Sequence, residues 1–166
     1  MRIGVALGSN LGDRMTNLRT ARESIVDLAA DKSSVRVSPV YETEPLGCEP
    51  GAGKFLNAVM EIEYDGDSTA LLDQLIRVEE SLGRERDHAK NVSRKIDIDV
   101  LYADDLVINN ERLQLPHPRM HQRKFVLQPL ADIRPDLVFP NQKKAVTELL
   151  AEVQDSTKVS CFAEKW

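Results

Sequence analysis

Two aspartates lie two residues apart inside an apolar stretch of the chain. Residues 93–102 read SRKIDIDVLY, so Asp97 and Asp99 alternate with isoleucine and valine. In a strand, such residues share one face and lie roughly 7 Å apart at about 3.3 Å of rise per residue. Without a cation, two charges at that distance repel by about 2 kcal/mol at an effective dielectric near 20. The pair is compatible with a solvated polar face or with a Mg²⁺ site, so the neighbouring segments must decide.

A basic run comes directly before this strand and reverses the sign of a chain whose net charge is -5. Its cations, with His88 among them, are Arg84, Arg86, Lys90, Arg94 and Lys95. Such runs are often only solvated loops. Beside paired carboxylates, however, they suit a polyphosphate, because Mg²⁺ can bridge its oxygens while arginine forks neutralise the rest.

A second basic stretch covers residues 114–124, which contain no acidic residue. It carries His117, Arg119, His121, Arg123 and Lys124. Two histidines four residues apart could bind zinc from a helix, but prolines on both sides of His117 disfavour a helix there. We therefore interpret this stretch as a second set of anion contacts.

The glycine-rich segment 44–55, EPLGCEPGAGKF, is not a phosphate-binding P-loop. Five residues rather than four separate Gly47 from Gly53, and Phe55 stands where a P-loop has serine or threonine. A strand follows, where a P-loop would start a helix. The segment is either a mobile loop that covers a substrate or a plain connection. A shorter motif, LGSN at residues 7–10, predicts a tight turn and little else.

Composition indicates a globular protein with one domain, residues 1–166. Hydrophobic residues make up 42% and charged residues 30% of the 166 residues, and the chain has two cysteines. We expect a cytoplasmic protein, because the N-terminal residues read as a strand rather than a signal peptide and no apolar run approaches the ~20 residues of a membrane span. The negative net charge argues against nucleic-acid binding, and we expect no membrane association.

The periodicity predicts an α+β fold with the element order β-α-β-β-α-β, the ferredoxin-like split pattern. The expected strands are residues 2–8, 34–44, 55–64 and the aspartate strand, and the expected helices are residues 13–30 and 67–83, the second with Ser68 as N-cap and Gly83 as its end. We expect an antiparallel sheet with the helices packed mainly on one face. C-terminal additions would be a strand at 106–108, a helical turn within 113–123, an extended segment at 136–140 and a helix at 146–153.

The motifs together resemble the 6-hydroxymethyl-7,8-dihydropterin pyrophosphokinases of folate biosynthesis. The matching segments, in order, are ALGSNLGD, YETEPLG, FLNAV, GRER, SRKIDIDVLY, INNERLQLPHPRM, RKFVLQPL and PDLVFP. The most specific part is the combination of R-x-x-D-x-D with the downstream LPHP block. The resemblance implies a ferredoxin-like fold and transfer of pyrophosphate from ATP to the pterin hydroxymethyl group with release of AMP. We expect a monomer.

The resemblance also implies roles for individual residues. Asp97 and Asp99 would hold two Mg²⁺ ions on ATP, and Arg84 and Arg94 would join them in catalysis. The implied ATP contacts are Leu72, Glu79, Arg84, Arg94, Val100, Arg112, His117 and Arg123. The implied pterin contacts are Thr43, Pro45, Leu46, Gly47, Phe55, Asn57, Asp97 and Phe125, with the two phenylalanines stacking on the ring and the Asn57 amide meeting its pyrimidine edge. Arg86 would lie in a loop that closes over the site.

Two other functions use the same features. A Mg²⁺-dependent phosphohydrolase could employ the same two aspartates, with water in place of the pterin alcohol. A non-catalytic ferredoxin-like module could bind RNA or a small regulator, but RNA-binding sheets usually expose aromatic side chains and these are only 5% of this chain. The motifs contain no evident general base.

Overall fold

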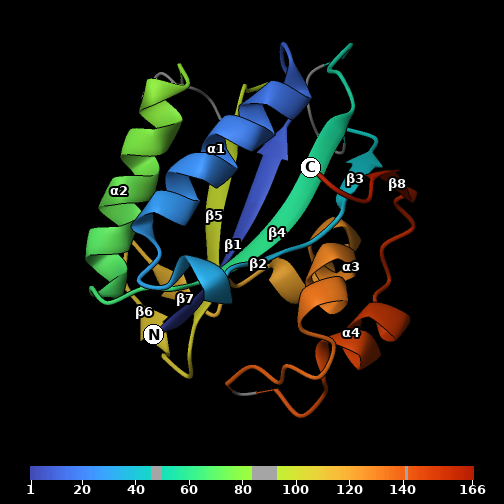
Figure 1. Cartoon of the computed structure of the whole chain (residues 1–166). Helices are drawn as coiled ribbons and strands as arrows, with labels where there is room; N and C mark the ends of the chain where they lie inside the picture. Colours follow the sequence, from blue (N-terminus) through green and yellow to red (C-terminus); the bar gives the residue numbers. More distant parts are fainter. Residues whose placement is uncertain (46–49, 84–92, 141) are drawn as a thin grey trace.

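The computed structural model describes residues 1–45, 50–83, 93–140 and 142–166, and within these ranges it contains a six-stranded antiparallel sheet (Figure 1). Five strands run in the order β5-β1-β4-β3-β8, and the short β2 also pairs with β4. The strands are β1 (Arg2–Ser9), β2 (Arg36–Val37), β3 (Val40–Thr43), β4 (Phe55–Glu63), β5 (Asp97–Ala103) and β8 (Val159–Ala163). A separate hairpin pairs β6 (Ile108–Asn109) with β7 (Gln114–Leu115).

The first two helices along the chain begin after an aspartate whose side chain accepts from free backbone N–H groups of the first turn. Four α-helices lie within the described residues. They are α1 (Arg14–Leu28), α2 (Ser68–Ser81), α3 (Lys124–Ile133) and α4 (Val146–Glu152). The carboxylate of Asp67 caps α2 by accepting from the N–H groups of Thr69 and Ala70 at 2.9 and 2.8 Å. The prediction of Ser68 as the cap is therefore wrong by one residue, because Ser68 is already helical. Gly83 follows α2 with φ +91°, which fits its predicted role at the helix end.

Helices cover both faces of the sheet. On one face, Ile3, Val5 and Leu7 of β1 share a buried cluster with Leu18 of α1 and Leu71 of α2. On the other face, a second buried cluster joins β4 and β5 to α3 and α4, through Val59, Leu101, Tyr102, Leu127, Leu130 and Val146. The element order β1-α1-β3-β4-α2-β5 follows the prediction, although the expected strand at 34–44 is divided into β2 and β3. The expectation that helices lie mainly on one face does not hold.

The C-terminal third contains the elements that the sequence pattern did not predict. Pro129 lies inside α3, and proline is usually a sign against a helix interior. Strand β8 pairs with β3 and so extends the sheet, yet most of its side chains are exposed, so it lacks the alternation that identifies a half-buried strand. Residues 137–139 form no regular element, and the predicted strand at 106–108 begins only at Ile108.

Strand β1 carries small residues on the face toward α3. Their size decides which groups can pack directly on the backbone of the strand. A Cβ placed on Gly4 would lie 2.1 Å from the ring of Tyr102. That ring cannot easily move, because its hydroxyl donates to the buried Glu61 carboxylate at 2.7 Å and the ring packs on Phe139 with 5.6 Å between centroids. Arg134 also donates to both Glu61 oxygens at 2.9 Å. Gly4 is thus the place where an aromatic ring rests directly on the backbone of the sheet.

We predict that Gly4→Ala lowers the free energy of unfolding by about 1–3 kcal/mol, the usual cost of overpacking a core. Urea denaturation measures the change. Gly8→Ala on the same strand face is the matched control, since its Cβ would have no neighbour closer than 3.4 Å. Equal losses in the two variants would contradict the steric explanation.

Candidate active site

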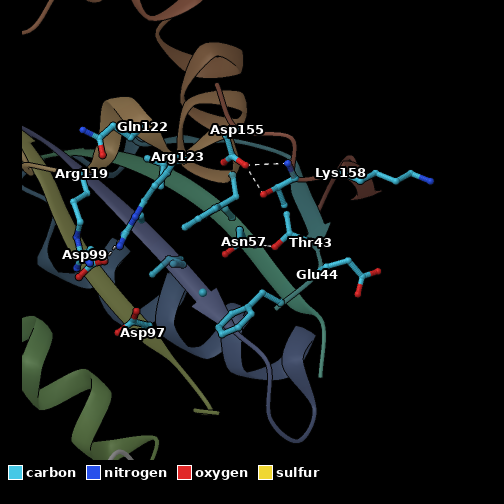
Figure 2. A pocket seen from close by; sticks show the side chains of 18 of the residues that line it. Thr43, Glu44, Asn57, Asp97, Asp99, Arg119, Gln122, Arg123, Asp155 and Lys158 are labelled. Atoms are coloured by element: carbon cyan, nitrogen blue, oxygen red, sulfur yellow. Dashed lines mark hydrogen bonds and ion pairs between the residues drawn. The ribbon is translucent and has the colours of Figure 1, made fainter. Parts of the chain in front are cut away.

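The part of this sheet face that α3 leaves open contains a pocket of about 780 Å³ (Figure 2). Its walls come from β1, β4, β5, the start of α3 and the segment that precedes β8. In Figure 2 the β5 carboxylates lie at one end and the Asn57–Thr43 pair at the other. The main lining side chains are Thr43, Phe55, Asn57, Arg94, Asp97, Asp99, Arg119, Arg123, Phe125 and Asp155.

The carboxylate end combines two acids, Asp97 and Asp99, with three arginines. The arginines are Arg94, Arg119 and Arg123. Asp97 and Asp99 pair with Gly8 and Ala6 of β1, which places both carboxylates on the pocket face. Arg94 Nη1 donates to Asp97 Oδ1 at 2.8 Å, and Arg123 Nη1 lies 4.0 Å from Asp99 Oδ2. The two carboxylates keep 29% and 42% of their side-chain surface exposed, so they remain accessible to a ligand.

His117 is held close to this end in its neutral form. Its backbone N–H donates to the Leu101 carbonyl of β5 at 2.8 Å, just after the cis bond between Leu115 and Pro116. Burial, followed by the charges of Arg123 and Arg119, lowers the pKa of His117 to about 4. Since Nδ1 accepts from the Arg119 N–H at 3.2 Å, the ring proton is on Nε2, which is then a hydrogen-bond donor.

The opposite end suits a flat, polar ring. Asn57 Nδ2 donates to Thr43 Oγ1 at 2.9 Å, which fixes the orientation of a buried amide. Phe55 lies near this end, because a Cβ on Gly8 would be 3.4 Å from Asn57 Oδ1 and 3.8 Å from the Phe55 ring. Phe125 also lines the pocket, and the Arg123 guanidinium lies 5.5 Å from its ring centroid. Stacking of aromatic rings on a planar ligand is consistent with this arrangement.

Gly8 lies between the two ends of the pocket. A Cβ there would be 3.4 Å from Asn57 Oδ1 and 3.9 Å from the Asp97 Cβ. The absence of a side chain leaves the floor open, so one ligand group can reach from the amide end to the carboxylate end. The LGSN motif, which alone signalled only a turn, therefore contributes to the site.

One wall was missed by sequence reasoning. Residues Gln154–Lys158 line the pocket, and Asp155 Oδ2 accepts from the Lys124 N–H at the start of α3 at 2.8 Å. Partial burial opposes ionisation of Asp155, but hydrogen bonds from Thr157 and Lys124 outweigh it and lower the pKa of that carboxyl. Asp155 thus caps the start of α3 from a distant segment. It fixes the backbone N–H of Lys124, the residue between Arg123 and Phe125. A lone aspartate in a polar loop gave no signal of this role.

Eight predicted site residues line this one pocket: Thr43, Phe55, Asn57, Arg94, Asp97, Asp99, Arg123 and Phe125. Pro45 follows the lining residue Glu44. Five others lie outside its lining: Leu72, Glu79, Val100, Arg112 and His117. Arg84, Leu46 and Gly47 fall outside the described residues, as do Arg86 and the central parts of both loops expected to cover the substrates.

The residues outside the lining have other contacts. Buried Glu79 accepts from the N–H of Ile98, the residue between the two aspartates, at 2.8 Å. Val100 is buried in the core beneath α1 and α2, and Leu72 packs against that core. Arg112 Nη2 lies 2.5 Å from Asp73 of α2. These side chains support or surround β5 rather than face the pocket.

A cation in this pocket would depend on oxygens from a ligand. Within the described ranges, no group of three or more His, Cys, Asp or Glu residues could hold a metal ion. Mg²⁺ fits the Asp97 and Asp99 pair, because it commonly uses one or two carboxylates and completes its shell with phosphate oxygens and water.

Among the described residues, no helix is long and apolar enough to cross a membrane.

Comparisons with known proteins agree on one family. The family model for 7,8-dihydro-6-hydroxymethylpterin-pyrophosphokinase (HPPK) matches residues 4–135. A protein of Haemophilus influenzae named 2-amino-4-hydroxy-6-hydroxymethyldihydropteridine pyrophosphokinase is 38% identical over 151 residues, covering 91% of this chain and 92% of the relative. A Bacillus subtilis protein of the same name is 42% identical over 129 residues, covering 78% and 75%.

A solved structure shows the same fold at low identity. The crystal structure of Plasmodium falciparum HPPK-DHPS with pteroate has a TM-score of 0.70 at 14% identity and covers 91% of this chain. This chain spans only 42% of the length of that one. The match therefore supports the fold of the described part.

We predict that His117 makes stability depend on pH. Its folded pKa of about 4 lies below its ordinary value of 6.5, so protonation favours the unfolded state. The contribution to stability is complete above pH 6.5 and is lost as pH falls toward 4. Urea denaturation at pH 7 and pH 5 should show a smaller loss for His117→Asn than for the unchanged protein. His121→Asn is the control, and coincident pH dependences for the protein and His117→Asn would refute the prediction.

Proposed function

The chain belongs to the 7,8-dihydro-6-hydroxymethylpterin-pyrophosphokinase family, and from that premise we propose how its pocket binds the two substrates. The enzyme transfers pyrophosphate from ATP to the hydroxymethyl group of 6-hydroxymethyl-7,8-dihydropterin in folate biosynthesis. One observation carries the proposal: a single pocket has a carboxylate and arginine end and an amide and phenylalanine end, with Gly8 between them. ATP would occupy the first end and the pterin the second.

Asp97 and Asp99 would hold two Mg²⁺ ions that arrive with ATP. Both carboxylates project from one face of a paired strand, and the N–H of Ile98 between them is bound by Glu79. When bound, Mg²⁺ neutralises and orients the triphosphate. Arg94 now engages Asp97 Oδ1, so its guanidinium would move from that carboxylate to a phosphate when the cation binds.

The remaining cations would surround the phosphate chain. Arg119 and Arg123 line the pocket just before α3, and their side chains point toward Asp99 in Figure 2. Neutral His117 can donate from Nε2 without adding a charge. Arg84 and Arg112 remain predicted ATP contacts from the resemblance, as do Leu72, Glu79 and Val100.

The pterin would bind at the Asn57 end. Because Thr43 Oγ1 accepts one Nδ2 hydrogen, Asn57 keeps its other hydrogen and its carbonyl oxygen for a ligand. A side-by-side donor and acceptor match the pyrimidine edge of a pterin. Phe55 and Phe125 would stack on the ring, while Pro45, Leu46 and Gly47 remain predicted pterin contacts. The hydroxymethyl group would then extend over Gly8 toward the aspartates.

This arrangement favours attack of the pterin hydroxyl on the β-phosphorus of ATP, with AMP as the leaving group. The described side chains act by positioning and by neutralising charge, which is how enzymes of phosphoryl transfer generally work. The proposal retains the expectation of a monomer that acts in the cytoplasm, where ATP is available. The phosphohydrolase alternative uses the same carboxylates and differs in its products.

We predict that MgATP and 6-hydroxymethyl-7,8-dihydropterin yield AMP and a pterin diphosphate in equal amounts. Phosphorus NMR or nucleotide chromatography identifies both products. A reaction without the pterin is the control and should form neither. ADP as the main nucleotide would indicate attack on the γ-phosphorus, and ATP turnover without pterin would favour the hydrolase.

We predict that Asp97→Asn and Asp99→Asn each lower kcat/KM by about 100-fold or more. Loss of a carboxylate that holds Mg²⁺ removes several kcal/mol of transition-state stabilisation, and each 1.36 kcal/mol is tenfold in rate. Both side chains are partly exposed, so the melting temperature should change little. Asp27→Asn, which removes an exposed ion pair with Lys32 on α1, should keep full activity. Near-normal Mg²⁺-dependent activity of either pocket variant would disprove the assignment.

A further inference from the structure

We propose that Asn10 is a positioning residue that joins the two substrate ends of the pocket and sets Arg94 for the reaction. The role assigned to Arg94 rests on the proposed function. Asn10 directly follows β1 and keeps only 5% of its surface exposed. It does not line the pocket, so any effect on catalysis must pass through the residues that it binds.

Asn10 binds the backbone of Arg94 in both directions. Its own N–H donates to the Arg94 carbonyl at 3.2 Å, and its Oδ1 accepts from the Arg94 N–H at 2.8 Å. These two hydrogen bonds fix the peptide groups on either side of the Arg94 Cα. The Arg94 guanidinium lies in turn 2.8 Å from Asp97. The position of a phosphate-binding arginine thus depends on the end of a strand buried in the sheet.

The amide nitrogen of Asn10 makes the remaining contacts. Nδ2 donates to Ser93 Oγ at 3.1 Å and, at a longer 3.4 Å, to the carbonyl of Gly53. Gly53 precedes Phe55, the residue that we place against the pterin, by two positions. A Cβ on Gly53 would lie 3.1 Å from the Asn10 carbonyl oxygen, so the two backbones are in close contact. One carboxamide therefore joins the pterin-side segment to the ATP-side segment.

A purely local role would not produce these contacts. The nearby turn and helix are stabilised by other residues: Asp13 accepts from the Thr16 N–H, and Asn17 donates to Ser9 Oγ and the Leu11 carbonyl. The Asn10 side chain instead reaches residues 43, 83 and 84 positions away. Asparagine is suited to this place because it alone combines an acceptor and a donor of this size.

The test compares Asn10→Ala with Asn17→Ala, an asparagine of the same region whose bonds are local. We expect Asn10→Ala to lower kcat/KM about 100-fold, the effect of roughly 1 Å of misplacement at a reacting centre, and Asn17→Ala to remain near normal. NMR of the unliganded protein should show faster amide hydrogen exchange at Arg94 in Asn10→Ala. Unchanged exchange at Arg94 would overturn the proposal.

A double-mutant cycle separates positioning from general stability. If Asn10 acts through Arg94, Asn10→Ala should cost little further kcat in an Arg94→Ala background. An equal loss in both backgrounds would show a structural role and reject the proposal.

Gly53→Ala gives an independent test if Asn10→Ala does not fold. The added methyl would press on the Asn10 carbonyl, so exchange at Arg94 should again become faster although the change lies in the other segment. Normal exchange at Arg94 in this variant would contradict the link. Failure of the unchanged protein to produce AMP would reject the proposed function, whereas the exchange experiments would still decide whether Asn10 holds Arg94.

Discussion

The repulsion between two carboxylates on one strand face is the constraint around which the rest of the site is arranged. Asp97 and Asp99 cannot move apart, because β5 is paired with β1 and the N–H of Ile98 between them is bound to Glu79. Positive charge beside the two carboxylates offsets their repulsion. Arg94 supplies that charge beside Asp97 and Arg123 beside Asp99, while burial, followed by the charges of Arg123 and Arg119, lowers the pKa of His117 and keeps its ring neutral. The pocket is thus ready for a polyanion with its cations and poorly suited to a neutral ligand at this end.

The same face of β1 is part core and part binding site, and side-chain size decides which. At Gly4 the missing side chain is replaced by the Tyr102 ring, and the sheet is covered by the cluster that includes α3. At Gly8, four residues along, the space is left to the ligand. At the core end, the Tyr102 hydroxyl donates to the buried Glu61 carboxylate, which also accepts from Arg134. One continuous face of β1 therefore contributes both to the core of the fold and to the pocket.

Much of this could be predicted from the sequence, for reasons that vary along the chain. Alternation identified the faces of β4 and β5, and the spacing of Asp97 and Asp99 identified the carboxylate end, because these signals are local. The family resemblance predicted that Thr43, Asn57 and Phe125 contact one ligand, and all three line the same pocket. Helix α3 was not predicted because Pro129 interrupts its pattern, and β8 because its side chains are mostly exposed. Asp155 and Asn10 act through residues far away in sequence, and no local pattern reveals such contacts.

The position of Asp155 in the chain affects how the enzyme matures during synthesis. Asp97, Asp99 and the arginines and phenylalanines of the pocket all precede the segment that completes its wall and caps α3. A nascent chain can form β1, β4 and β5 early, since domains fold as their residues leave the ribosome. Its pocket still lacks a wall until residues 154–158 emerge and β8 pairs with β3. The pocket is therefore completed late in synthesis, and ribosomal products cut short before this segment would carry Asp97 and Asp99 without a complete pocket wall.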